Sequence, residues 1–199
     1  MPMKHLPAGE RRKRIVLGAM EAFARTGFKG TRSRDVAKAA GVSEALIFKH
    51  FPNKRAMQKA IIEERIRQTG EFLSPELKKA PLEEALPAMA ARILQVSERD
   101  PHFMRLLYFA GLENEPLAPM FFRRRVASSV GEVAGLYRLW VRRRWVRKSV
   151  DPTLFAWTFM GCVYQLAAAR HIFGVRKVSD RAADVAEGVA ALFLQGVRT

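Results

Sequence analysis

Cationic and polar side chains gather near the N-terminus in residues 27–59, which read GFKGTRSRDVAKAAGVSEALIFKHFPNKRAMQK. Between residues 32 and 55, two acids, Asp35 and Glu44, oppose six cations: Arg32, Arg34, Lys38, Lys49, Lys54 and Arg55. Lys and Arg at this density neutralise phosphates, and short side chains between them can contact base edges. The chemistry that this stretch favours is therefore non-covalent recognition of a nucleic acid.

The same stretch carries the start and stop signals of two short helices. Thr31 is a candidate N-cap for the first helix, Gly41 is its C-terminal stop, and Ser43 caps the second. Because so few residues separate the two helices, they must cross steeply and share a small apolar core. That core is predicted to contain Val36, Ala40, Val42, Ile47 and Phe51. This geometry is a helix-turn-helix, whose second helix lies in the major groove of DNA. A plain helical hairpin is the competing interpretation, and the surplus of cations argues against it.

Each DNA-contacting side chain has a predicted role. The side chains predicted to contact phosphates, and so to fix the position of the protein along the DNA, are Thr31, Ser33, Arg34 and Lys54. Those near base edges or the adjoining backbone are Glu44, Ala45, Leu46, Lys49 and His50, and Ser43 and Phe48 complete the DNA-binding set. A carboxylate can accept a hydrogen bond from cytosine, a lysine can donate to guanine, and a small apolar group can contact the thymine methyl.

The order of residues in this stretch resembles the TetR (tetracycline-repressor) family of bacterial transcriptional regulators. The resemblance rests on Thr31, Val36, Ala37, Ala40, Gly41, Val42, Ser43, Ile47, Phe48, His50, Phe51 and Lys54. It implies an all-α fold, with an N-terminal three-helix helix-turn-helix DNA-binding domain and a C-terminal helical ligand-binding and dimerisation domain. One position departs from the family pattern. Phe48 stands where the family usually has Tyr, and it lacks the hydroxyl that often touches a phosphate.

Local signals divide the rest of the chain. A first helix is predicted over 8–26, ending at Gly27, and Asn53 caps a fourth helix that ends near Gly70. Proline breaks follow near residues 75 and 81, which gives predicted domains of 1–54 (helix-turn-helix), 55–73 (connecting helix) and 74–199 (ligand binding and dimerisation). Later helices are predicted at about 82–98, 101–111, 116–148, 152–173 and 179–197, with starts at Asp100, Asp151 and Ser179-Asp180. No segment alternates with period two, so no strand is expected.

The last two predicted helices carry more apolar residues than one buried face needs, so each must be covered on a second side. The predicted dimer interface comprises Phe155, Phe159, Val163, Leu166, Val185, Val189, Leu192 and Phe193. The TetR resemblance implies the same homodimer, held by a four-helix bundle from the final two helices of each chain. Such a dimer places two recognition helices in successive major grooves, so its DNA partner is predicted to be a palindromic operator.

An aromatic group in the middle of the chain is the candidate ligand site. By the same resemblance, this part of the chain would hold a small-molecule effector whose binding moves the DNA-binding helices. The predicted lining residues are Phe103, Leu107, Tyr108, Met120, Phe121 and Trp140. An apolar cavity with few polar groups suits an apolar or amphipathic ligand. Ordinary core packing is the competing interpretation for each of these residues.

Composition bounds the class of protein. The formal net charge of the 199-residue chain is +16, and residues 1–70 hold 16 Lys and Arg against six Asp and Glu. Such a charge attracts a polyanion. Cys162 is the single cysteine, which excludes an internal disulfide and favours a cytoplasmic setting. The apolar run 154–169 is shorter than the roughly 20 residues that span a bilayer, so no membrane partner is expected.

Catalysis finds no support in the sequence. His5, His50, His102 and His171 have no paired spacing for a metal, and no glycine loop could cradle a phosphate, so no enzyme, metal or cofactor is predicted. Two alternatives to a ligand-released repressor stay open. One is a ligand-independent DNA-coating protein, which would bind scrambled and palindromic duplexes equally. The other is a helical small-molecule enzyme or carrier, which would turn over or carry a ligand without binding DNA.

Overall fold

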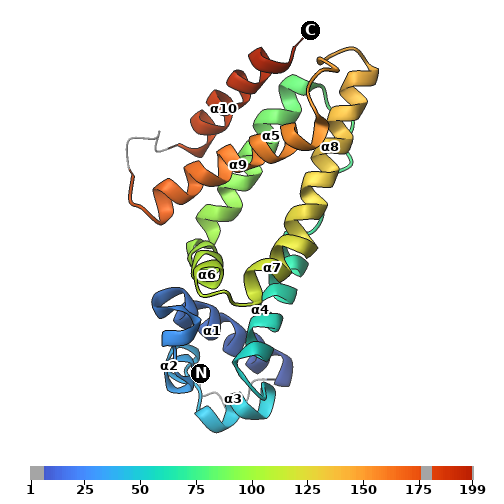
Figure 1. The fold of residues 1–199 in the computed structure, drawn as a ribbon. Helices are drawn as coiled ribbons and strands as arrows, with labels where there is room; N and C mark the ends of the chain where they lie inside the picture. The colour runs from blue at the N-terminus through green and yellow to red at the C-terminus, as the bar shows by residue number, and fades with distance from the viewer. Residues whose placement is uncertain (1–6, 176–180, 199) are drawn as a thin grey trace. The chain divides into compact units, whose positions relative to one another are not determined.

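The computed structural model describes residues 7–175 and 181–198, and this part of the chain consists of helices joined by loops (Figure 1). Four helices come first: α1 Ala8–Gly30, α2 Ser33–Ala40, α3 Glu44–His50 and α4 Lys54–Thr69. They are followed by α5 Leu82–Arg99, α6 Pro101–Leu112, α7 Leu117–Phe121, a π-helical turn Phe122–Val126, α8 Ala127–Arg142, α9 Pro152–His171 and α10 Ala182–Val197. The described residues contain no strand, only an isolated antiparallel bridge between Val146 and Arg198. The predicted all-α fold class is confirmed.

The helices divide into two compact units that do not follow the order of the chain. Unit 1 contains residues 1–68 and 102–122, and unit 2 contains residues 69–101 and 123–199. These units have their limits at residues 68, 101 and 122, whereas the predicted domain limits at residues 54 and 73 stay a prediction. Helix α4 lies in unit 1, and α6 and α7 pack with the N-terminal helices although 33 residues of unit 2 precede them in the sequence.

Several predicted helix signals act as expected. The Ser43 hydroxyl accepts a hydrogen bond from the Leu46 N–H at 3.2 Å, Asn53 accepts from Ala56 at 2.9 Å, and Asp151 accepts from Leu154 at 2.7 Å. These bonds satisfy N–H groups that have no partner within the first turn of their helix. The predicted start at Ser179-Asp180 lies outside the described residues, and so does His5.

The single helix predicted over 116–148 instead contains a π-helical turn and ends earlier, at Arg142. Helix α7 passes into the π-helical turn Phe122–Val126 before α8 begins, and α8 ends at Arg142. Beyond it, Arg144 adopts a left-handed conformation with φ of 60°. The loop is then held down by Val146, which is buried, and by the Tyr137 hydroxyl, which donates to the Arg147 carbonyl at 2.9 Å. Burial raises the pKa of Tyr137.

Aromatic side chains from α8, α9 and α10 form the core of unit 2. The rings of Tyr137 and Phe155 lie 4.5 Å apart, and Phe159 meets Phe193 edge-on at 5.2 Å. Trp140 beside them is fully buried. This cluster holds α8 to α9 and α9 to α10, so the later helices form one packed body. Among the described helices, none is long and apolar enough to cross a membrane.

Candidate nucleic-acid interface

Helices α2 and α3 form the predicted helix-turn-helix. Gly41 ends α2 with φ of 66°, a left-handed conformation that favours glycine, and the Val42 N–H then bonds back to the Ala37 carbonyl at 2.9 Å. Val36 and Ile47 are fully buried between the helices, Ala40 and Phe51 nearly so, and Val42 is half-buried. The predicted small core is confirmed. It fixes the angle at which α3 leaves the turn.

Helix α1 braces this pair through one very close approach. A Cβ atom added at Gly18 would lie 2.6 Å from the backbone nitrogen of Ala40 and 2.7 Å from its Cα. No side chain larger than hydrogen fits at that distance, so the crossing of α1 and α2 depends on this glycine. The Arg12 guanidinium adds a second contact, 5.0 Å from the centre of the Phe51 ring.

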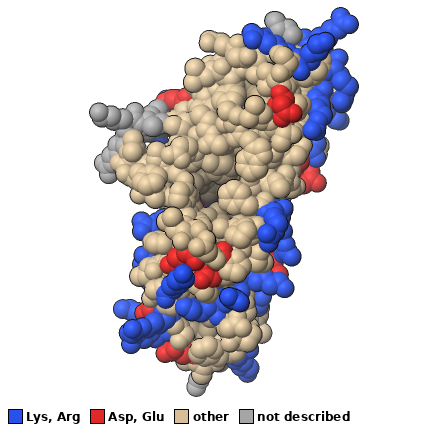
Figure 2. All heavy atoms as spheres, viewed as in Figure 1, with Lys and Arg blue, Asp and Glu red and all other residues tan. Residues whose placement is uncertain are grey.

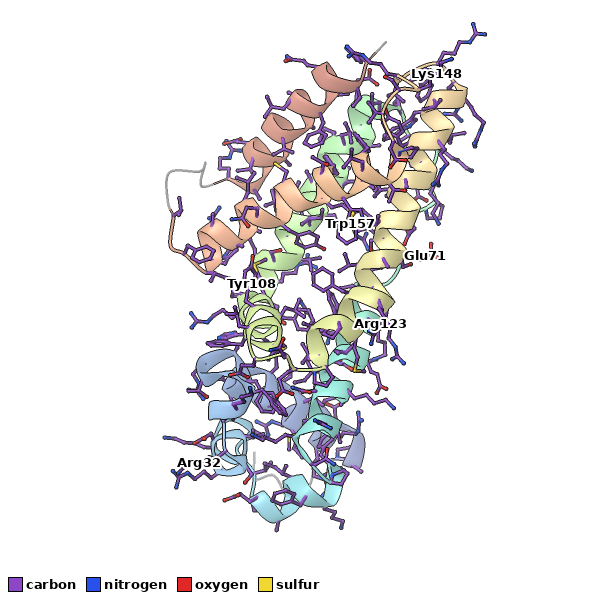
Figure 3. All side chains as sticks on the ribbon, in the orientation of Figure 1. Arg32, Glu71, Tyr108, Arg123, Lys148 and Trp157 are labelled. Atoms are coloured by element: carbon purple, nitrogen blue, oxygen red, sulfur yellow. The ribbon has the colours of Figure 1, made fainter. Side chains whose placement is uncertain are left out.

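The outer surface of α2 and α3 is left open. Its exposed side chains include Arg32, Arg34, Lys38, Glu44, Ala45, Phe48 and Lys49, with Ser33, Leu46 and His50 half-buried. Figure 2 shows Lys and Arg side chains spread over the region formed by α1 to α4, and Figure 3 shows Arg32 projecting away from α2. Phe48 is 52% exposed although it is aromatic. An apolar ring that the fold leaves in solvent on this face is available to contact a groove wall.

Glu44 is not free in this conformation. Its carboxylate accepts a hydrogen bond from the Ser33 hydroxyl, which joins the first residue of α2 to the first residue of α3. The second carboxylate oxygen of Glu44 can still accept from a cytosine amino group. Ser33 has a single O–H donor, so its predicted phosphate contact requires the bond to Glu44 to break.

Thr31 occupies a different place from the predicted one. It is 1% exposed, and its hydroxyl lies 2.6 Å from the Gly27 carbonyl and 2.8 Å from the Thr26 hydroxyl. Arg32, not Thr31, is the N-cap position of α2, where the Asp35 carboxylate accepts from the Arg32 N–H at 2.8 Å. The predicted cap at Thr31 is thus wrong, and its buried hydroxyl cannot reach a phosphate in this structure.

Lys54 also serves the interior of unit 1. Its ammonium donates to the carbonyls of Phe28 at 2.9 Å and Thr31 at 3.0 Å, and lies 4.7 Å from the centre of the Phe28 ring. Two of its three N–H donors are therefore occupied, which leaves one for a phosphate. The sequence motif locates this lysine but does not show that it ties the start of α4 to the end of α1.

Replacement of Lys54 by alanine is expected to destabilise the protein by about 1–2 kcal/mol, because two charge-assisted hydrogen bonds and a cation–π contact are lost. The matched control is Lys59→Ala, which removes an exposed lysine of the same helix whose ion pair with Glu63 spans 3.9 Å. Thermal unfolding followed by circular dichroism measures both variants. Equal midpoints would mean that the internal bonds of Lys54 contribute nothing.

The six predicted ligand-site residues are divided between the units. Phe103 and Phe121 are buried in unit 1 and meet edge-on at 4.9 Å, with Leu107 and Met120 half-buried, whereas Tyr108 is 42% exposed. Trp140 is fully buried in unit 2, and its indole N–H has no hydrogen-bond partner among the described residues. A buried donor without an acceptor is uncommon in proteins. It is the feature of this set that favours a ligand over simple core packing.

Four of the predicted dimer-interface residues instead form the core of unit 2: Phe155, Phe159, Val163 and Val189. Leu166, Val185 and Phe193 are half-buried, and Leu192 is 70% exposed. The exposed face of α9 carries residues that the sequence did not single out for this role, namely Leu154 at 62%, Trp157 at 45% and Tyr164 at 38%. Their spacing places them on one side of the helix, together with Gly161. We call these four residues and Leu192 the apolar face of α9 and α10.

The helices of the candidate nucleic-acid interface also match a known family. Residues 15–61, which run from α1 into α4, match the family model described as bacterial regulatory proteins, tetR family. The N-terminal helices of the chain are thus similar to the DNA-binding part of the TetR family. RutR, a helix-turn-helix-type transcriptional regulator of Escherichia coli O157:H7, is 29% identical over 137 residues, 66% of this chain and 62% of RutR. The regulator YvkB of Bacillus subtilis strain 168 is 34% identical over 61 residues, 31% of this chain and 32% of YvkB.

The fold of this chain is shared with a solved structure over nearly its whole length. The transcriptional regulator FadR of Bacillus subtilis, solved in complex with stearoyl-CoA, superposes with a TM-score of 0.73 at 17% identity, covering 94% of this chain and 99% of FadR. The chain thus matches less than two thirds of the length of RutR and YvkB in sequence, while its helical fold extends over the C-terminal half as well. In the described part of the chain, no cluster of three or more His, Cys, Asp or Glu could hold a metal.

Proposed function

We propose that this protein is a homodimeric, sequence-specific DNA-binding transcriptional regulator of the TetR family, a repressor that leaves a palindromic operator when it binds a small ligand. The observation that carries the proposal is the open surface of α2 and α3. Arg34, Lys38 and Lys49 are exposed there, while Ile47 anchors α3 from the other side. A short helix that presents small and cationic side chains outward has the shape and charge to lie in a major groove.

Dimerisation is supported by the apolar face of α9 and α10. Monomers seldom expose large apolar side chains together on two adjacent helices, because each loses the free energy of burial, about 25 cal/mol per Å². Trp157, Tyr164 and Leu192 are exposed on helices that pack against each other in unit 2. A second copy that covers this face would give a twofold interface. Two recognition helices would then read two half-sites of a palindrome.

A ligand-responsive function is supported by two observations. The Trp140 N–H is buried without an acceptor in the described part of the chain, and FadR of Bacillus subtilis, which shares the fold, was solved with stearoyl-CoA. We propose that an apolar or amphipathic ligand with a hydrogen-bond acceptor is the effector. Nothing in the arrangement of the side chains favours an enzymatic reaction over this binding function.

The experiment that tests the function is selection of bound duplexes from a random pool by the purified protein, followed by titration of the selected duplex at several salt concentrations. Lys49→Ala and Arg34→Ala are each expected to weaken the free energy of binding by about 1–3 kcal/mol. Each should also reduce the slope of log affinity against log salt concentration by about 1. Lys79→Ala, an exposed lysine of unit 2, is the matched control and should change neither quantity. Affinity that is equal for selected and scrambled duplexes would support DNA coating instead.

A further inference from the structure

Helices α6 and α7 are packed in one unit but joined covalently at both ends to the other. The chain leaves unit 2 at Pro101, forms α6 and α7 within unit 1, and returns to unit 2 at Arg123. The return crosses the π-helical turn Phe122–Val126. Turns of this kind are rare and occur often at functional sites. A rearrangement of α5 or α8 is therefore transmitted to α6 and α7 through the backbone.

Glu113, the residue after α6, binds the backbone of α1 through its carboxylate. Its Oε2 atom accepts hydrogen bonds from the N–H groups of Phe28 at 2.8 Å and Lys29 at 3.1 Å. These two donors follow Gly27, whose φ of 75° and ψ of 174° break α1. N–H groups just after such a break have no carbonyl partner one turn earlier, so they need an acceptor from elsewhere. A carboxylate supplied from 84 residues further along the chain satisfies both.

The contact is tight on both sides of the break. A Cβ atom at Gly27 would clash with Glu113 Oε1, at 2.2 Å, and press on Phe109 Cδ1, at 3.3 Å. One turn earlier, the Arg105 guanidinium donates to the Ala24 carbonyl at 3.1 Å. Helix α6 thus holds α1 by an acceptor on one side of Gly27 and a donor on the other. A pair of this kind resists sliding as well as separation.

The segment that Glu113 grips leads directly into the helix-turn-helix. The Gly27 carbonyl accepts from the Thr31 hydroxyl, and the Phe28 and Thr31 carbonyls accept from Lys54 of α4. Ser33, two residues after Thr31, begins α2. Residues 27–31 therefore connect α1, α4, α6 and α2 within five positions, and all of these bonds lie inside unit 1.

We infer that Glu113 is a positioning residue for DNA recognition, which transmits a displacement of α6 and α7 into the junction of α1 and α2. This inference deepens the proposed function by naming the contact through which α6 regulates the DNA-binding surface. When α6 moves, the carboxylate either carries residues 28 and 29 with it or releases their N–H groups. Both outcomes change how α2 and α3 are presented.

Hydrogen exchange of the full-length protein without DNA tests the contact directly. In Glu113→Ala the amides of Phe28 and Lys29 are expected to exchange roughly tenfold faster, because each loses its acceptor. The amides of α2 should follow, whereas those of α8 in the other unit should not. Glu115→Ala removes a neighbouring acid without a side-chain hydrogen bond to α1 and is the matched control. Exchange at residues 28 and 29 that is the same in both variants would overturn the inference.

Transmission is tested by a second substitution. Leu106→Ala opens a cavity at a buried position of α6 and should raise exchange in α2 of the otherwise unchanged protein. In the Glu113→Ala background it should no longer do so. An equal effect of Leu106→Ala in both backgrounds would show that the signal bypasses Glu113. If Glu113→Ala fails to fold, Glu113→Gln, which keeps one acceptor oxygen, is expected to give intermediate exchange. None of these measurements contains DNA. Hydrogen exchange can therefore contradict the inference about Glu113 while the duplex selection supports the proposed function, and it can support the inference while the selection finds no specific duplex.

Discussion

Leu192→Glu is expected to prevent the proposed dimer from forming and to lower the affinity for the selected duplex by roughly 100-fold or more. Leu192 is 70% exposed on α10, which packs against α9, the helix that exposes Leu154, Trp157, Gly161 and Tyr164. In a twofold interface one substitution introduces two carboxylates, one on each chain. Burying an unpaired carboxylate costs free energy, so the two chains are expected to stay apart. A monomer offers one recognition helix, so the free energy from the second half-site is lost.

Sedimentation velocity at several concentrations and titration of the duplex measure the two effects. The control is Leu112→Glu, since Leu112 is 81% exposed on α6 and carries no predicted role in association. It should leave the sedimentation coefficient and the affinity unchanged. If Leu192→Glu sediments like the unsubstituted chain at every concentration, the apolar face of α9 and α10 is not the dimer interface.

Gly18→Ala is expected to destabilise the protein by about 3 kcal/mol and to abolish specific DNA binding. The added Cβ would lie 2.6–2.7 Å from three atoms of Ala40, two of which belong to the backbone. Backbone atoms cannot rotate away as the end of a flexible side chain can, so α1 and α2 must separate or α2 must tilt. Either shift changes the angle of α3, because Ala40 precedes the turn at Gly41 and packs in the core with Ile47.

Thermal unfolding should show the midpoint of Gly18→Ala lowered by roughly 6–12 °C for a chain of this size. Gly111→Ala is the matched control in the same unit. Gly111 is also inside a helix, and a Cβ atom there meets nothing within 4 Å, so the substitution should be neutral or should stabilise by up to about 1 kcal/mol. A variant Gly18→Ala that melts with the unsubstituted protein and binds the duplex normally would refute the close-packing argument.

Signals that act within one turn of a helix could be read from the sequence. Ser43, Asn53 and Asp151 cap their helices as expected, and Gly41 takes the left-handed conformation that its place after Ala40 predicts. The buried contacts of Val36 and Ile47 follow from helical spacing and a short turn. These features depend on neighbouring residues, so the residue types and their order are enough to predict them.

Features that depend on residues far apart in the sequence could not be read in this way. Glu113 is one of two acids near the end of α6, and no local pattern shows that it reaches Phe28 and Lys29. The role of Lys54 within unit 1 is hidden for the same reason. On α9 the apolar residues surround the helix, so hydropathy could not decide which of them, Phe155 or Trp157, faces the core. The π-helical turn within the helix predicted over 116–148 has no proline or glycine at Phe122–Val126 that would predict it.

The interrupted order of unit 1 also limits how such proteins can be recombined. A fragment that ends after residue 68 keeps the helix-turn-helix but lacks residues 102–122, so the N–H groups of Phe28 and Lys29 would lose the carboxylate that accepts from them. DNA specificity could be exchanged between relatives by joining the N-terminal segment of one to the C-terminal half of another. In such a chimera, residues 1–68 and 102–122 of unit 1 would come from different proteins. A functional exchange therefore requires α6 and α7 to travel with the first four helices.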